Sequence, residues 1–288
     1  MIIRILLFVL IPILSYSQWT QTNGPYGGWV ESLAIKGNNM FAGTRTDLFR
    51  SSDNGSTWTQ VNIGTQNPDV FSLVVSENNI LAGTDNGVFV STNNSVFWSK
   101  VLTDNFIYSF VINKSNVYAG SLDRGIYFSS NNGLNWVQIN NNIPDSNITS
   151  LAISGDKLIA GTWGGGVCLS SDNGTTWVQI NNGLLNPYLF AVAIQGNTIF
   201  AGCTTSPWGI YSSTDFGANW TQVFTDYPVV SFAVNGINIY AGSVLGVYLS
   251  TDSGISWNPL NNYGVKNVIW SFAISCDNIF IWYLWRWG

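Results

Sequence analysis

The chain has 288 residues, of which 9% are charged and 15% are aromatic, and its formal net charge at pH 7 is −5. The sequence is sparsely charged and mildly acidic, and it contains no basic stripe of the kind that nucleic-acid binding requires. We therefore expect no nucleic-acid partner. Histidine is absent, which removes the commonest general base and metal ligand and disfavours serine-triad, cysteine-protease and histidine-ligated metal chemistry. We accordingly expect neither a metal nor a cofactor.

The N-terminal segment has the pattern of a secretory signal peptide. Arg4 precedes an apolar run over residues 5–14, and small residues up to Ser17 stand where a signal peptidase cleaves. A membrane span would need about 20 apolar residues, and polar residues follow too soon for that. The sequence therefore predicts that residues 1–17 are a signal peptide cleaved after Ser17, and that residues 18–288 form a secreted chain without a membrane span.

One eight-residue motif recurs six times along the chain. Its first occurrence reads SSDNGSTW at residues 51–58, and the tryptophans that end the six motifs are 37 to 43 residues apart. Each motif has an Asp or Asn at its third position and a Trp at its eighth: Asp53 and Trp58, Asn93 and Trp98, Asn131 and Trp136, Asp172 and Trp177, Asp215 and Trp220, and Asp252 and Trp257. A repeat of this period is typical of solenoids, propellers and arrays.

Each repeat unit contains four short apolar runs separated by Asn, Gly, Asp and Ser. Runs of this kind, rich in Val, Ile, Phe, Tyr and Trp, predict strands joined by turns, and no stretch of ten residues shows helical periodicity. Four strands in about 40 residues is the size of a propeller blade, and residues 18–288 hold about seven such units. A β-solenoid and an open array are the alternatives. We expect an all-β, seven-bladed β-propeller of four-stranded blades.

The recurring motif has a mechanical interpretation. An aspartate such as Asp53 can accept backbone N–H bonds within a turn, the glycine two residues later can adopt a positive φ, and the tryptophan can pin the hairpin onto its blade. A calcium site is the alternative, but too few carboxylates follow the triplet to complete a calcium loop. Asn93 and Asn131 replace the aspartate in two repeats, which a turn tolerates and a charged metal or catalytic role would not.

The S-x-D-x-G-x-x-W motif, with AGT and GVY strands around it, resembles the BNR/Asp-box propeller superfamily. That superfamily includes bacterial sialidases, xyloglucanase-type glycoside hydrolases, the sortilin ectodomain and photosystem II assembly-factor propellers. The resemblance covers nearly all of residues 18–288 and implies the propeller fold, but it says little about function. Exported Asp-box proteins of this Asn-rich, low-charge composition resemble bacterial cell-surface proteins, which implies a secreted or cell-surface location.

The two ends of the chain are expected to share the seventh blade. Residues 18–23, around Trp19, resemble a fourth strand, and residues 266–288 supply a first and a second strand. The N-terminal strand would then close an incomplete last blade that lacks its third strand.

The tail over residues 281–288 departs from the repeat. A Trp codon read one base later always encodes glycine, and the shifted tail would carry glycines at the spacing found in the earlier segment AGTWGGG, residues 160–166. The three tail tryptophans and their glycine counterparts, each pair 121 residues apart, are Trp282 and Gly161, Trp285 and Gly164, and Trp287 and Gly166. We hypothesise that the tail is a frameshift product and that the ancestral protein continued past residue 288. A genuine aromatic C-terminus is the alternative.

Positions that vary at a fixed place in the repeat are candidates for recognition. One such set precedes the recurrent small residue of each first strand: Glu31, Phe71, Tyr108, Thr149, Phe190, Val230 and Trp270. Loops between second and third strands add Arg45, Asp47, Asp85, Asp123, Arg124, Trp163 and Trp208 on the same face. An aromatic ring with a few charges suits a glycan or a protein or peptide ligand. The alternative is that these aromatics only fill the entrances of the blades.

Catalysis by the relatives' mechanisms is disfavoured. The resemblance to sialidases implies a cluster of three arginines, whereas residues 18–288 contain only Arg45, Arg50, Arg124 and Arg286. A xyloglucanase-like enzyme needs two carboxylates across a cleft, for which Glu31, Asp47, Asp85 and Asp123 are the candidates. We therefore expect a non-catalytic, monomeric scaffold or binding module, with a glycoside hydrolase as the alternative.

The three cysteines, Cys168, Cys203 and Cys276, are widely spaced and odd in number. They form neither a disulfide framework nor a zinc motif. We expect buried thiols, with a bridge between Cys168 and Cys203 as the alternative.

Overall fold

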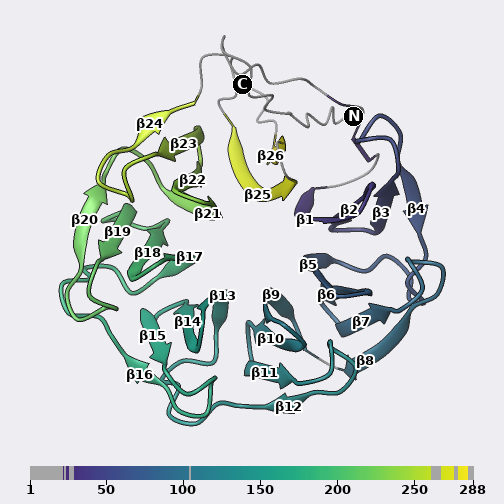
Figure 1. Ribbon diagram of the computed structural model, residues 1–288, viewed down its shortest axis with the longest axis horizontal. Coiled ribbons are helices and arrows are strands. Elements are labelled where there is room, and N and C mark those ends of the chain that lie inside the picture. The colour runs from purple at the N-terminus through teal and green to yellow at the C-terminus, as the bar shows by residue number, and fades with distance from the viewer. Residues whose placement is uncertain are drawn as a thin grey trace.

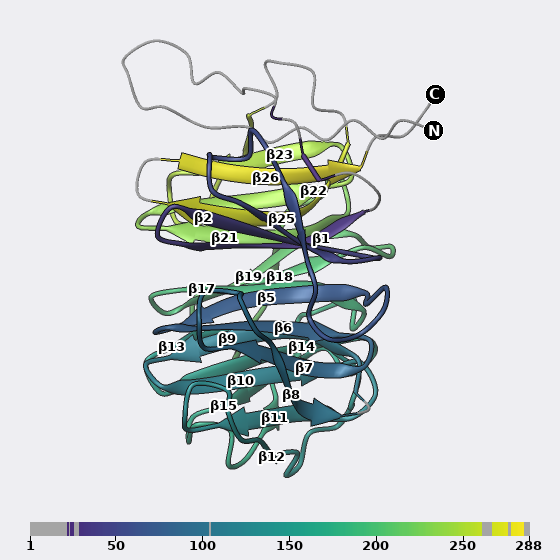
Figure 2. The same cartoon turned by 90° about the vertical axis from the view of Figure 1, so that its right-hand side faces the viewer.

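The computed structural model describes residues 22, 24–25, 29–103, 105–260, 267–275 and 278–284. These residues form 26 strands, arranged as a ring of radial sheets (Figure 1). Figure 2 shows the strands running across the thickness of the disc. Within the described ranges, no helix has the length and apolar character needed to cross a membrane. The predicted signal peptide, residues 1–17, and the last four tail residues lie outside these ranges.

Each sheet is an antiparallel meander that starts at the centre of the ring. The innermost strands are β1 (Val30–Lys36), β5 (Val70–Ser76), β9 (Ile107–Asn113), β13 (Ile148–Ser154), β17 (Leu189–Gln195), β21 (Val229–Asn235) and β25 (Val268–Ser275). The second strands are β2 (Asn39–Thr44), β6 (Asn79–Thr84), β10 (Asn116–Ser121), β14 (Lys157–Thr162), β18 (Thr198–Cys203), β22 (Asn238–Ser243) and β26 (Asn278–Leu284). The third strands are β3 (Leu48–Ser51), β7 (Gly87–Ser91), β11 (Gly125–Ser129), β15 (Val167–Ser170), β19 (Gly209–Ser213) and β23 (Gly246–Ser250). The outer strands are β4 (Thr59–Val61), β8 (Ser99–Thr103), β12 (Val137–Gln138), β16 (Val178–Gln179), β20 (Thr221–Phe224) and β24 (Asn258–Pro259).

The prediction of seven four-stranded blades is confirmed for six of them. The seventh sheet contains only β25 and β26 among the described residues, and this incomplete blade agrees with the prediction that it lacks a third strand. The ring nevertheless closes at its centre, because β1 packs against β25 on one side and β5 on the other. The strand expected around Trp19 lies outside the described residues. Residues 281–284 extend β26, and Trp282 pairs with Ser271.

The hydrophobic core consists of wedges between neighbouring blades. Seven apolar clusters each join residues of two adjacent blades. The cluster between the seventh blade and the first contains Trp282 and Phe280 together with Val30, Leu33 and Met40. Stability is therefore distributed around the ring, and closing the ring buries apolar surface on both sides of every blade.

The Asp box is a turn between the third and fourth strands, as the sequence predicted. In the first box, Oδ1 of Asp53 accepts a hydrogen bond from the N–H of Thr57 at 2.9 Å, and Oγ of Ser51 accepts one from the N–H of Gly55 at 2.9 Å. Gly55 has a φ of 84°. Asn131 makes the same Oδ1 contact in its own box, at 3.0 Å. The side-chain oxygens are thus engaged by the turn itself.

The aspartate boxes are expected to make the fold sensitive to acid. Hydrogen bonds within the turn lower the pKa of Asp53, Asp215 and Asp252 from 3.8 to about 2. A lowered folded-state pKa contributes stability that is present above pH 3.8 and is lost as the pH falls toward 2. The triple variant Asp53→Asn, Asp215→Asn, Asp252→Asn should remain close to wild type at neutral pH and lose less stability in acid, as measured by urea unfolding across this range.

The natural asparagine boxes provide the matched control for this prediction. Asn131→Asp should make the variant more sensitive to acid than wild type. Equal acid losses in wild type and in both variants would show that the boxes do not carry the pH dependence.

The two described cysteines are buried free thiols, so the alternative of a bridge between them is wrong. Cys168 lies on β15 and Cys203 on β18, each within an inter-blade cluster. Burial raises the pKa of both thiols to about 12. They pack as small apolar residues, as expected.

Candidate functional site at the channel mouth

Every innermost strand carries a β-bulge near its start. The bulge lies between the first and third residues of β1, and the corresponding irregularity recurs in the other six inner strands. The bulged residues are Glu31, Phe71, Tyr108, Thr149, Phe190, Val230 and Trp270, the set that the sequence singled out. A bulge re-aims the side chain of its extra residue. Here the seven side chains converge on one cavity of about 280 Å³, which we call the channel mouth.

The recurrent serines that follow the bulges join neighbouring blades. Oγ of Ser72 donates a hydrogen bond to the backbone carbonyl of Ile107 at 3.2 Å, and Oγ of Ser231 donates one to that of Ile269 at 2.6 Å. Oγ of Ser109 instead accepts a bond from the N–H of Leu151 at 2.9 Å. Neighbouring blades are separate sheets, and these side-chain hydrogen bonds connect their inner strands. The recurring position is thus structural, and the variable bulge position is free to differ.

Four of the bulged residues form a continuous aromatic arc. The ring centroids of Phe71 and Tyr108 are 5.5 Å apart, those of Tyr108 and Phe190 are 6.2 Å apart, and those of Phe190 and Trp270 are 5.5 Å apart. Tyr108 and Phe190 meet across Thr149, and Phe190 and Trp270 meet across Val230, because the two intervening side chains are small. We call Phe71, Tyr108, Phe190 and Trp270 the aromatic arc.

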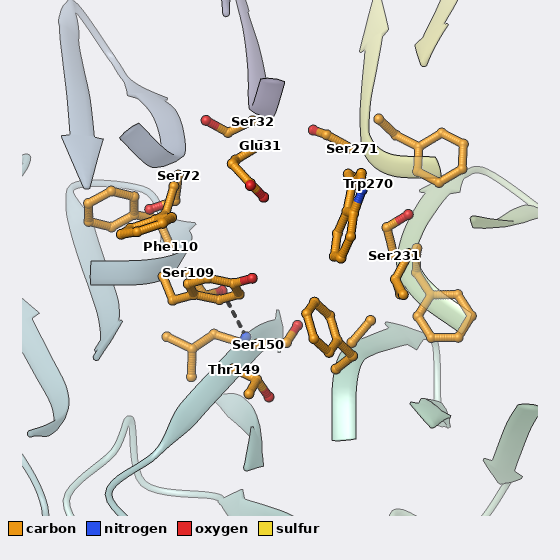
Figure 3. A pocket seen from close by; sticks show the side chains of 18 of the residues that line it. Glu31, Ser32, Ser72, Ser109, Phe110, Thr149, Ser150, Ser231, Trp270 and Ser271 are labelled. Atoms are coloured by element: carbon orange, nitrogen blue, oxygen red, sulfur yellow. Dashed lines mark hydrogen bonds between the residues drawn. The ribbon is translucent and has the colours of Figure 1, made fainter. Parts of the chain in front are cut away.

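Glu31 fills the remaining place in this ring. Figure 3 shows Glu31 and Trp270 pointing into the cavity from neighbouring inner strands. The Glu31 side chain is only 5% exposed, and its Oε1 accepts a hydrogen bond from Nε of Arg45 at 2.6 Å. Burial raises the pKa of Glu31, while the bond from Arg45 opposes that rise. The guanidinium of Arg45 also lies 4.3 Å from the ring centroid of Trp29, which is a cation–π arrangement.

Comparison with known proteins finds no matching family model and no matching curated protein. Solved structures do match. YCF48 bound to D1 peptide is 14% identical, with a TM-score of 0.75, over 96% of this chain and 100% of that chain. The extracellular domain of BT4673 from B. thetaiotaomicron is 16% identical, with a TM-score of 0.74, over 91% of this chain and 38% of that chain. The GH74 xyloglucanase from Xanthomonas campestris is 15% identical, with a TM-score of 0.62, over 80% of this chain and 46% of that chain.

The chain has the β-propeller fold, which these BNR-type neighbours share. The resemblance indicated by the repeats is therefore confirmed at the level of the fold. This propeller spans 38% and 46% of the BT4673 and xyloglucanase chains. At these identities, the shared architecture identifies neither the ligand nor the chemistry of this propeller.

Three aromatic residues at the rim of the propeller's channel mouth were missed from the sequence. Trp29, Phe106 and Tyr188 are 38%, 46% and 45% exposed, and each stands two residues before a bulged residue. Phe106 lies 6.4 Å from Phe71, and Tyr188 lies 5.8 Å from Trp163. The i, i+2 spacing of a strand entrance could have identified them, because alternate residues face the same side.

The predicted loop residues of the propeller divide into two groups. Trp163 packs beside the aromatic arc, because its ring lies 6.0 Å from that of Phe190, and Arg45 donates a hydrogen bond to Glu31. Arg124 instead pairs with Asp123 at 3.7 Å, and Nε1 of Trp208 donates a hydrogen bond to the carbonyl of Thr225 at 3.1 Å. None of these loop residues lines the channel mouth itself, but Trp163 and Arg45 contact residues that do.

Proposed function

We propose that this protein is an exported, non-catalytic binding module that holds a peptide or glycan at the channel mouth. The observation that carries the proposal is the convergence of the seven variable bulged residues on one cavity. Recurrent residues hold the blades together there, while the variable ones supply aromatic faces and one carboxylate. A concave site in which polar groups stand among aromatic side chains is a common form of binding pocket.

The distribution of carboxylates supports binding over hydrolysis. Glycoside hydrolysis by two carboxyl groups requires both to flank the scissile bond. Among the described residues that line the channel mouth, Glu31 is the only carboxylate, and Arg45 already holds one of its oxygens. The remaining polar side chains of the lining are hydroxyls and the indole of Trp270.

The structural neighbours are consistent with this proposal. One of them is a propeller bound to a peptide, and another is an extracellular domain. The signal-peptide pattern of residues 1–17 supports export, to the medium or to a bacterial cell surface.

Peptide and glycan arrays probed with the labelled protein would test the proposal. We expect a ligand whose affinity falls at least about tenfold in Trp270→Ala and in Trp163→Ala, because each change removes a ring on which the ligand packs. Phe97→Ala is the matched control, because this side chain is 67% exposed in an Asp-box turn, at the opposite end of the strands. Isothermal titration would give the affinities.

Two results would contradict the proposal. One is a ligand that binds both tryptophan variants as well as it binds wild type, which would place the site elsewhere. The other is turnover of a sialoside or a β-glucan that is abolished by Glu31→Gln or Asp85→Asn, which would make the protein a hydrolase.

A further inference from the structure

The channel mouth combines aromatic rings and a carboxylate in the arrangement of a cation site. The aromatic arc covers most of the ring of bulged residues, and Glu31 occupies the gap between Phe71 and Trp270. The negative faces of aromatic rings attract an ammonium group within about 6 Å, and a buried carboxylate adds a direct ionic contact. A four-carbon stem would pack against the same rings.

One polar group of the cavity, the Glu31 carboxylate, remains available to a ligand. Of the described residues, only Arg45 donates a hydrogen bond to the Glu31 carboxylate, and it contacts Oε1. Nε1 of Trp270 is buried and has no hydrogen-bond partner. Because this nitrogen is covered by the protein, the cavity meets the ring of Trp270 and not its N–H group. The cavity therefore offers an acceptor for an ammonium group, surrounded by aromatic rings.

The surrounding face is acidic. The bulges, the loops that precede inner strands and the loops between second and third strands all lie on this face, because the strands alternate in direction. Their described carboxylates are Glu31, Asp47, Asp69, Asp85, Asp123, Asp145 and Asp226, against Arg45 and Arg124 in the same segments and Lys100, whose amine reaches Asn86. Such an excess of one sign attracts an oppositely charged partner.

Arg45 shows that a positive charge can lie next to Glu31 and an aromatic ring. Its guanidinium contacts both Glu31 and the Trp29 ring, yet its side chain is 47% exposed, whereas that of Glu31 is 5% exposed. The internal cation therefore sits at the rim and leaves the interior of the aromatic arc open.

We propose that the channel mouth binds the side-chain ammonium group of a lysine in a peptide. The ammonium group contacts Glu31, and the alkyl stem packs within the aromatic arc. Arg45 competes with the ligand for Glu31. This inference rests on the proposed function and identifies the ligand class of the same site.

The test uses a blocked pentapeptide with lysine at the centre of four alanines, and its counterparts with norleucine or glutamate in place of lysine. Binding is followed by NMR of the indole N–H signals, with the Trp270 signal assigned by its absence in Trp270→Phe. We expect the lysine peptide to bind at least about tenfold more tightly than the norleucine peptide, the glutamate peptide not to bind, and the Trp270 signal to shift.

Two variants with opposite expected effects sharpen the test. Glu31→Gln should abolish the preference for lysine, whereas Arg45→Met should raise affinity for the lysine peptide, because it frees the carboxylate and removes a competing charge. Asp123→Asn is the control, because it removes a carboxylate from the same face outside the cavity and should change affinity less than about threefold. Thermal unfolding of each variant confirms that the fold is retained.

Equal binding of the lysine and norleucine peptides, or an unchanged preference in Glu31→Gln, would overturn this inference. A neutral glycan that binds in a Trp270-dependent manner, with no binding of the lysine peptide, would overturn the inference and leave the proposed function standing. Absence of any ligand on the arrays and of any lysine-peptide binding would overturn both.

Discussion

Replacing Gly83 by alanine is expected to lower the free energy of unfolding by about 2–3 kcal/mol. A Cβ at this position would lie 2.4 Å from Oγ of Ser72, 2.7 Å from Cγ2 of Ile107 and 2.8 Å from the carbonyl oxygen of Ile107. The first atom belongs to the same blade and the other two to the next. A backbone oxygen cannot rotate away, so the two blades would have to move apart.

Urea unfolding of Gly83→Ala measures this effect, and Gly37→Asn is its control. Gly37 lies in a turn with a φ of 57° and has no atom within 4 Å of a Cβ. Asparagine tolerates that conformation, so this variant should stay within about 0.5 kcal/mol of wild type. A Gly83→Ala protein as stable as wild type would show that the two blades can move apart without lowering the free energy of unfolding.

The seventh blade has no glycine at the position that corresponds to Gly83. Gly83 pairs with Ser72, and Gly43 pairs with Ser32, whereas Ser271 pairs with Trp282. Trp282 is only 2% exposed, it packs in the wedge against the first blade, and its Nε1 has no partner. The position that is glycine in six blades is thus a tryptophan in the seventh. The frameshift of residues 281–288 stays a prediction, which the nucleotide sequence would test.

Much of the architecture could be predicted because the sequence repeats, so that each unit can be compared with the others. Six boxes at a nearly constant spacing fix the number of units, and the four runs in each unit fix the strands. The bulged positions were also identified, because they vary next to a serine such as Ser72 that recurs for a structural reason. Periodicity reveals which residues occupy equivalent places, and in a ring equivalent places converge on the axis.

The internal arrangement of the site could not be predicted in this way. Phe190 reaches both Tyr108 and Trp270 only because Thr149 and Val230 are small enough to be bypassed. The ion pair of Glu31 with Arg45 depends on the course of a loop between two strands. Neither contact is a property of the repeat, so both required the coordinates.

The tryptophans of the Asp boxes also differ in ways that the motif does not predict, because their Nε1 groups have different hydrogen-bond partners. Nε1 of Trp58 donates a hydrogen bond to the carbonyl of Gly55 in its own turn at 3.1 Å, whereas Nε1 of Trp177 donates to Ile139 of the preceding blade at 3.2 Å. Nε1 of Trp98 is buried without a partner. Identical positions in the motif therefore staple a hairpin in one repeat and join two blades in another.

Trp177→Ala is consequently expected to destabilise the protein by about 3–5 kcal/mol. Trp177 is 2% exposed and packs with Tyr118, Ile126 and Ile148 between the third and fourth blades. Its removal would leave a cavity and deprive the Ile139 carbonyl of its indole donor. Trp58 is only partly buried, so Trp58→Ala should cost about 1–2 kcal/mol.

Urea unfolding of these two variants, with Trp177→Phe as a third, separates the contributions. Phenylalanine retains most of the packing in the wedge and removes only the indole donor, so Trp177→Phe should fall between wild type and Trp177→Ala. Equal losses for Trp177→Ala and Trp58→Ala would mean that every box tryptophan contributes to its own hairpin alone. A larger loss for Trp177→Ala would mean that the deeper burial of Trp177 and its hydrogen bond to the preceding blade stabilise the protein more than the contacts of Trp58 do.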